Sequence, residues 1–192
     1  MPLLKIELMK KFGFFLLAAL CFAAVAAEPQ LRRSTDLRQK SLSNLKAINY
    51  MIYCFADSRK DFLPPDFTEL VYGGFVNPDE LAKVFIAPHD RVSKVAQDQQ
   101  IKAQNTSYVY VGKGMHLGRS NANLFIVFED PAKLPENIDT VAVLYLNGKT
   151  ALKKIPPQFR KNRRSVAEFL LKELPVAAAE KELILKNAAD EQ

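Results

Sequence analysis

The chain has 192 residues, and its 27 Lys and Arg outnumber its 21 Asp and Glu, which gives a formal net charge of +6. Apolar residues make up 48% and charged residues 25%, a balance typical of globular proteins and not of disordered ones. Two Cys, seven Gly and no Trp exclude a disulfide-stapled miniature fold and collagen-like or Gly-rich architectures. The length suits one domain, and no sequence motif indicates a reaction.

The first 27 residues have the pattern of a secretory signal peptide. Two lysines precede a continuous apolar run, and small residues follow it (Lys10, Lys11, 12–22 and 23–27). This order predicts cleavage after Ala26 or Ala27 and a periplasmic or secreted protein. Met9 offers a second start, because MKKFGFFLLAAL is complete without the eight residues before it.

A retained N-terminal anchor is the alternative to cleavage. The apolar stretch is shorter than the about 20 residues that a membrane-spanning helix needs. Cleavage leaves no stable membrane span, and it removes Cys21. Cys54 then has no partner within the chain and can form a disulfide only with a second copy, as a homodimer.

The first element expected after the signal peptide is a long helix over residues 31–55. Its main apolar face is formed by residues at helical spacing, namely Leu37, Leu45, Ile48, Ile52 and Phe55, and Ser41 falls on the same face. A smaller, half-polar stripe runs along the opposite side: Ser43, Ala47, Tyr50 and Cys54. Residues 57–105 are rich in loops, with short helical turns expected at 67–72 and 79–84.

Four short strands follow, at residues 107–111, 123–129, 140–146 and 150–155. Asn147-Gly148 lies directly between the last two and predicts an antiparallel hairpin with a type I′ turn. The order of elements predicts an α+β fold in which the long N-terminal helix packs on a four-stranded antiparallel meander.

Two short helices are expected after Pro156-Pro157 ends the sheet. The first covers residues 165–174 with Ser165 as its cap, and the second covers residues 176–187. The chain thus divides into a signal peptide, an α+β domain and a C-terminal helical tail (1–27, 28–175 and 176–192). We hypothesise that the C-terminal segment packs beside the N-terminal helix and covers part of its half-polar stripe. The alternatives are that it covers the sheet edge, or that the stripe mediates a homodimer.

Five segments resemble, in this order, the globular domain of the pseudopilin-like proteins of type II secretion, in the large bacterial group with a prepilin-type N-terminus. They are SLSNLKAINYMIYCFADSRKDFLPPDFTEL (41–70), KVFIAPHD (83–90), NTSYVYV (105–111), FIVFED (125–130) and VAVLYLNGKTALKKI (141–155). The resemblance covers residues 37–171 and implies the pilin-like version of the fold.

The chain departs from that family at its N-terminus and at two cysteines. An ordinary signal peptide replaces the prepilin cleavage site and the long stem, and the family's two cysteines are Ser41 and Ala87 here. The stem holds a pilin subunit in the membrane and then in the filament, so a chain without it is not expected to be a filament subunit. The resemblance then implies an exported, non-enzymatic protein that acts by binding or assembly in the cell envelope. The alternative is a membrane-tethered accessory subunit of a type II secretion or pilus system.

The sharpest charge feature is a run of basic residues without an acid: Lys149, Lys153, Lys154, Arg160, Lys161, Arg163 and Arg164. Such a patch predicts binding of phosphate, lipid headgroups or acidic polysaccharide, unless the acidic C-terminal residues neutralise it. Export argues against nucleic acid, so the expected partners are an envelope protein or an anionic surface.

No catalytic, cofactor or metal site is expected among the remaining residues. The loop bracketed by four carboxylates lacks the spacing of a calcium loop (Glu129, Asp130, Glu136 and Asp139). The two histidines, His89 and His116, lack further zinc ligands at close spacing. A periplasmic hydrolase that uses Cys54 with one histidine is a further alternative, against a structural thiol.

Overall fold

The computed structural model describes residues 35–94 and 98–190, so the predicted signal peptide lies outside the described residues. Of the described residues, 39–94 and 98–190 belong to one compact unit, which contains the whole sheet. Within the described ranges, no helix combines the length and the apolar composition that a membrane crossing requires.

The N-terminal helix is described from residue 35 to residue 58. It ends where Lys60 and Asp61 adopt positive φ angles of 55° and 67°, and the N–H groups of Arg59 and Asp61 both donate to the Ala56 carbonyl at 2.9 Å. The connector that follows holds the two expected helical turns, α2 (Thr68–Tyr72) and α3 (Leu81–Phe85), with short 3-10 turns at Pro78–Glu80 and Ala103–Asn105.

The four predicted strands form one antiparallel sheet in the order β1-β2-β3-β4, so the meander is confirmed. Their bounds are Tyr108–Tyr110, Phe125–Glu129, Thr140–Tyr145 and Thr150–Lys154. All of β1 and β2 is buried, whereas β4 is an edge strand that is only partly covered. Helices therefore have to cover both faces of the central strands.

The β3–β4 hairpin is confirmed, but the predicted type I′ turn is wrong. A type I′ turn needs positive φ at both central residues. Here Gly148 has φ +79°, while Asn147 is not among the described non-glycine residues with positive φ. Gly148 N donates to Tyr145 O at 2.9 Å, and Tyr145 N to Lys149 O at 2.9 Å, the pattern of a three-residue loop with a bulge at glycine.

Two helices follow the sheet, as expected, with different starts. They are α4 (Arg163–Lys172) and α5 (Ala178–Asp190), and the 3-10 turn Pro157–Phe159 precedes them, while a further 3-10 turn, Pro131–Lys133, lies between β2 and β3. Asn162, and not Ser165, caps α4, because its side-chain oxygen accepts the N–H of Ser165 at 2.8 Å. Asn187 fixes α5 on the sheet by donating to the carbonyls of Val111 and Lys113, both at 2.9 Å.

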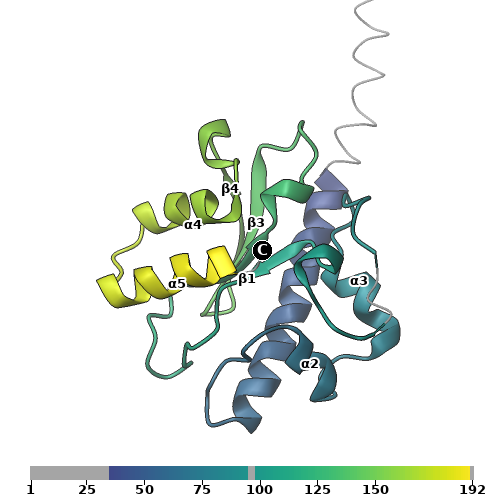
Figure 1. The fold of residues 1–192 in the computed structure, drawn as a ribbon, viewed down its shortest axis with the longest axis vertical. Helices are drawn as coiled ribbons and strands as arrows, with labels where there is room; N and C mark the ends of the chain where they lie inside the picture. The colour runs from purple at the N-terminus through teal and green to yellow at the C-terminus, as the bar shows by residue number, and fades with distance from the viewer. Residues whose placement is uncertain (1–34, 95–97, 191–192) are drawn as a thin grey trace, which may run out of the picture. The chain divides into compact units, whose positions relative to one another are not determined.

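The C-terminal helices lie on the opposite side of the sheet from the N-terminal helix (Figure 1). The hypothesis that they cover the half-polar stripe is therefore wrong. Ser43 and Tyr50 are exposed, and Cys54 is partly exposed. The buried side chains of α4 are instead Val166, Ala167, Leu170 and Leu171.

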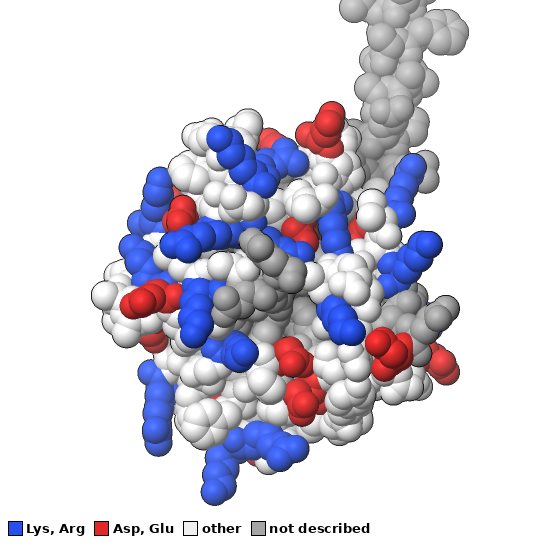
Figure 2. Space-filling view, in the orientation of Figure 1, with Lys and Arg blue, Asp and Glu red and all other residues white. Residues whose placement is uncertain are grey.

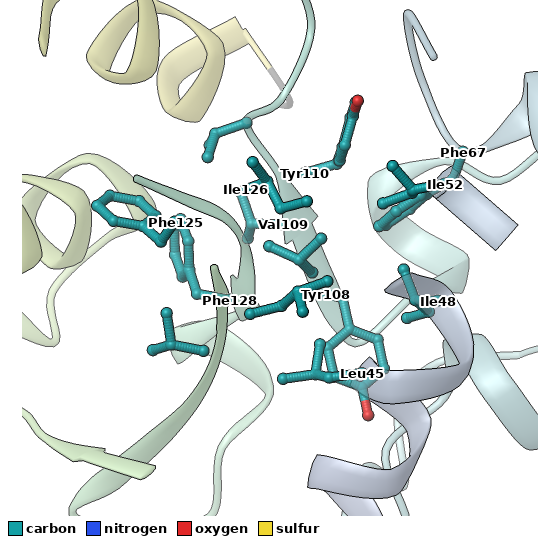
Figure 3. Close-up of a cluster of buried hydrophobic side chains, with 14 of the residues drawn as sticks. Leu45, Ile48, Ile52, Phe67, Tyr108, Val109, Tyr110, Phe125, Ile126 and Phe128 are labelled. Atoms are coloured by element: carbon teal, nitrogen blue, oxygen red, sulfur yellow. The ribbon is translucent and has the colours of Figure 1, made fainter. Parts of the chain in front are cut away.

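The core lies between the N-terminal helix and the sheet and continues on the far side of the strands. Figure 3 shows Leu45, Ile48 and Ile52 on the side of Tyr108 and Tyr110, with Phe125 and Phe128 on the other side of the strands. The buried positions of the N-terminal helix include Ser41, Leu45, Ile48, Ile52 and Phe55, as predicted, whereas Leu37 is half-buried.

Candidate anion-binding site

The candidate site is built at the place where β2 ends and α4 begins. Asp130 follows β2 directly and is 2% exposed. Its Oδ1 accepts the N–H of Ala132 at 3.1 Å, which starts the 3-10 turn, and its own N–H donates to Ser107 O at 2.9 Å. Hydrogen bonds to the backbone therefore fix Asp130 through both its carboxylate and its own N–H.

Arg163, the first residue of α4, pairs with this carboxylate. Its Nη2 and Nε donate to Asp130 Oδ2 at 2.6 and 3.1 Å. The Arg163 side chain is 17% exposed, so the pair is largely shielded from water. Charge-assisted hydrogen bonds of this kind are short and directional, and they fix the guanidinium plane.

A pocket of about 550 Å³ opens at this pair. Basic side chains line one part of it, and small side chains from the end of α5 and the 3-10 turn line another: Lys161, Arg163, Arg164, Ala132, Ala188 and Ala189, together with Asn162 and Asp130. Figure 2 shows Lys and Arg side chains gathering on the side of the molecule where α4 and α5 lie. Three of the seven predicted patch residues thus meet in one pocket.

The other four patch residues lie elsewhere. Lys153 Nζ is 3.4 Å from Glu173 Oε2, and Lys154 Nζ is 3.1 Å from Asp139 Oδ2. The hydrogen bond from Lys154 lowers the pKa of Asp139 below its ordinary value. Arg160 Nη2 donates to the Pro135 carbonyl at 3.4 Å, and Lys149 sits in the β3–β4 loop. The run of charge in the sequence is therefore not one surface in the fold.

A polar network around Ser107, whose carbonyl accepts the N–H of Asp130, was not anticipated from the sequence. Ser107 Oγ donates to Asp90 Oδ2 at 2.6 Å and accepts the N–H of Ala87 at 2.7 Å. Lys133 Nζ donates to Ser93 Oγ at 2.7 Å and to the carbonyls of Ala103 and Thr106. These residues come from segments far apart in the chain, so no local pattern predicts that they meet.

Two opposing effects act on the pKa of the Asp90 carboxyl, and the net result is a lowered pKa. Partial burial alone would raise the pKa of its carboxyl. The hydrogen bonds that it accepts from the Ser107 hydroxyl and from the N–H groups of Val92 and Ser93 outweigh burial, so the pKa lies below its ordinary value. Asp90 therefore stabilises the fold above the ordinary pKa, and this stabilisation is lost as the pH falls through the lowered value.

We expect Ser107→Ala to raise the pKa of Asp90, because the variant loses the shortest hydrogen bond to the carboxylate. Carboxyl ¹³C NMR titration of the full chain measures this directly. Unfolding in urea should show a larger loss of stability at pH 6 than at pH 2, since the stabilisation by the Asp90 carboxylate disappears as it is protonated. Ser43→Ala, an exposed serine on the N-terminal helix, is the control. An unchanged Asp90 pKa in Ser107→Ala would contradict the assignment.

The residues considered for catalysis have different neighbours. The neighbouring Cys54 thiol raises the pKa of the exposed Tyr50 phenol above its ordinary value. His116 stacks edge-on against Phe62 with ring centroids 4.9 Å apart. His89 is buried, and its Nε2 lies 3.8 Å from Glu129 Oε1. None of these three contacts joins the Cys54 thiol to a histidine.

The carboxylates considered for calcium are also separated by their roles. Glu129 is 1% exposed, and its Oε2 accepts the N–H of Ala142 at 2.7 Å within the sheet. Asp130 pairs with Arg163 and Asp139 with Lys154, while Glu136 is exposed. In the ranges that the structure describes, no group of three or more His, Cys, Asp or Glu side chains is arranged to hold a metal ion.

Comparison with known proteins does not identify a family for this chain. No protein-family model, no curated protein and no solved structure matches it.

Proposed function

We propose that the chain is a non-enzymatic protein of the cell envelope that binds an anionic group in the pocket at the start of α4. The observation that carries the proposal is the meeting of Lys161, Arg163 and Arg164 around one pocket, where Asp130 is the one acid among the described lining residues. Since Asp130 is already paired with Arg163, the positive charge of Lys161 and Arg164 remains for a ligand.

The ion pair between Arg164 and Glu168 does not remove this charge. Arg164 Nε is 3.2 Å from Glu168 Oε1, but both side chains are about half exposed. Exposed pairs one helical turn apart contribute only about 0.3–0.5 kcal/mol. A ligand with anionic oxygens can displace the Glu168 carboxylate at little cost, and an arginine fork binds phosphate or carboxylate oxygens with two hydrogen bonds.

The pocket suits a small anionic group on a larger molecule. Its volume of about 550 Å³ lies within the range of about 300–1,000 Å³ that is usual for ligand sites. Inorganic phosphate, a phospholipid headgroup and an acidic sugar share the same anionic oxygens. The three sources differ in what surrounds that group, so binding experiments can tell them apart.

The envelope location and the pilin-like assignment belong to the same proposal. They are supported by the signal-peptide pattern of the N-terminus and by the segments that resemble pseudopilins. The long helix followed by an antiparallel meander agrees with that resemblance. The anion pocket is lined by residues of α4 and α5, and these helices lie across the sheet from the N-terminal helix (Figure 1).

We expect the full chain to bind inorganic phosphate, or vesicles that contain anionic phospholipid in preference to neutral ones, with an affinity that falls as salt is added. The double variant Lys161→Glu, Arg164→Glu should bind at least about tenfold more weakly, because each lost charged hydrogen bond is worth about 1.5–3 kcal/mol. Titration calorimetry and vesicle sedimentation measure the two cases.

The matched control is the double variant Lys40→Glu, Lys46→Glu, which makes the same change of net charge at two exposed positions of the N-terminal helix. Its binding should equal that of the unmodified chain. Equal weakening by the control would show that the change of net charge alone accounts for the weaker binding. Absence of binding to phosphate and to both kinds of vesicle would contradict the proposal.

A further inference from the structure

A second hollow lies beside α2, well separated in sequence from the anion pocket. Its volume is about 540 Å³, and two segments line it: Asp66, Thr68, Glu69 and Tyr72 from α2 and the residue pair before it, and residues 100–104 from the loop that leads to β1. The proposed anion binding does not involve these residues.

Hydrogen bonds hold the two segments together. Ile101 N donates to Thr68 Oγ1 at 3.0 Å, and Thr68 Oγ1 returns a longer bond to Ile101 O at 3.4 Å. Asn105 ties the loop to itself, since its side chain accepts from Lys102 N at 2.7 Å and donates to Gln100 O at 2.9 Å. Ile101 is 8% exposed and anchors the loop in the core. The hollow is therefore formed before any ligand arrives, which lowers the ordering cost of binding.

The side chains that line the hollow present an aromatic ring and several polar groups to solvent. Tyr72 is 59% exposed, although tyrosine rings are usually covered in a folded chain. Within the described residues, the side chains of Glu69, Gln100 and Gln104 have no hydrogen-bond partner, whereas Asp66 Oδ1 accepts the N–H of Glu69 at 3.1 Å.

We propose that this hollow binds a neutral carbohydrate. A tyrosine ring offers a flat apolar surface to the C–H face of a sugar ring, and its hydroxyl remains available for a hydrogen bond. Carboxylates accept hydrogen bonds from sugar hydroxyls, and side-chain amides both donate and accept them. An aromatic face beside carboxylate and amide groups matches a ligand that is apolar on its faces and polar at its edge.

The charge of the hollow distinguishes its ligand from that of the anion pocket. The described lining holds two carboxylates, Asp66 and Glu69, and one cation, Lys102, whose Nζ lies 3.8 Å from Asp98 outside the lining. An anionic ligand would meet two carboxylates, so the hollow disfavours it. A quaternary ammonium ligand is the competing class, because it also stacks on tyrosine. The two amides favour the carbohydrate, since their carbonyl and NH₂ groups can both form hydrogen bonds with sugar hydroxyls, whereas a quaternary ammonium group has no N–H to donate.

The test uses the full chain labelled with 3-fluorotyrosine and followed by ¹⁹F NMR, with the Tyr72 signal identified by its loss in Tyr72→Phe. The probes are neutral oligosaccharides of the cello, chito and malto series, and choline as the cationic competitor. We expect at least one oligosaccharide series to shift the Tyr72 signal with saturation. By calorimetry Tyr72→Ala should bind about tenfold more weakly, the effect of about 1.4 kcal/mol, while Tyr72→Phe keeps the ring and most of the affinity.

The matched control is Tyr50→Ala, which removes another exposed tyrosine, on the N-terminal helix. Unchanged sugar binding in this control, together with the loss in Tyr72→Ala, supports the proposal. Three results would overturn it: no oligosaccharide shifts the Tyr72 signal at millimolar concentration, Tyr50→Ala weakens binding as much as Tyr72→Ala, or choline shifts the signal while no sugar does.

Discussion

Leu45→Ala and Ile48→Ala should each lower the free energy of unfolding by about 2–5 kcal/mol, the usual range for large-to-small changes in a core. Both side chains are 0% exposed. They lie on the face of the N-terminal helix that meets the sheet, close to Tyr108 in Figure 3. Each substitution therefore removes buried methyl groups and leaves a cavity that the packed helix and sheet can only partly close. Urea unfolding of the full chain, followed by circular dichroism, measures the loss.

Lys46→Ala is the control for these two variants, because Lys46 is exposed between them on the same helix. Its effect should stay within about 0.5 kcal/mol, as for most surface substitutions. Losses below about 0.5 kcal/mol for both core variants would show that this face does not support the fold.

Local patterns in the sequence predict the elements of this fold well. The short apolar segments and Asn147-Gly148 place the strands and the hairpin, and helical spacing identifies Leu45, Ile48 and Ile52 as core. The turn type depends on a contact that the pattern does not contain. Leu146 is 2% exposed and its N–H donates to Leu124 O at 2.7 Å. This bond draws Leu146 toward β2, so the loop has three residues and Gly148 alone takes the positive φ.

The uninterrupted apolar sequences of β1 and β2 predict the position of the C-terminal helices better than the half-polar stripe on the N-terminal helix does. The segments that form β1 and β2 read YVY and FIVFE, without an alternation of apolar and polar residues. Such runs are typical of strands that are covered on both faces. The N-terminal helix covers one face, and the amphipathic segment that follows the sheet supplies the cover for the other, where α4 and α5 lie.

The candidate sites could be predicted only in part, because they depend on contacts across long stretches of chain. The basic run contains Lys161, Arg163 and Arg164, but it does not show that Asp130 holds Arg163, 33 residues away in sequence. The same contact explains the cap of α4. Ser165 and Asn162 are both suitable caps by residue type, and the helix begins at Arg163, the residue that pairs with Asp130. The hollow beside α2 likewise joins residues 33 positions apart, as the Thr68–Ile101 bond shows.

We expect Arg163→Met to lower the free energy of unfolding by about 3 kcal/mol, since removing one partner of a buried ion pair leaves the other charge buried without compensation. Asp130 is the residue left behind, and its side chain is 2% exposed. The expected loss is at the lower end of the range because Arg163 is partly exposed, so water can reach the carboxylate in the variant. Urea unfolding of the full chain provides the measurement.

The double variant Arg163→Met, Asp130→Asn should recover part of this loss, because the buried charge is then gone and the amide can still accept the N–H of Ala132. Arg164→Met is the matched control: it removes an arginine next in sequence whose pair with Glu168 is exposed, and it should cost no more than about 0.5 kcal/mol. In 1 M salt the small effect of Arg164→Met should vanish and that of Arg163→Met should persist, since salt screens exposed pairs far more than buried ones. Equal, small effects of the two methionine substitutions would mean that Asp130 and Arg163 do not fasten α4 to the end of β2.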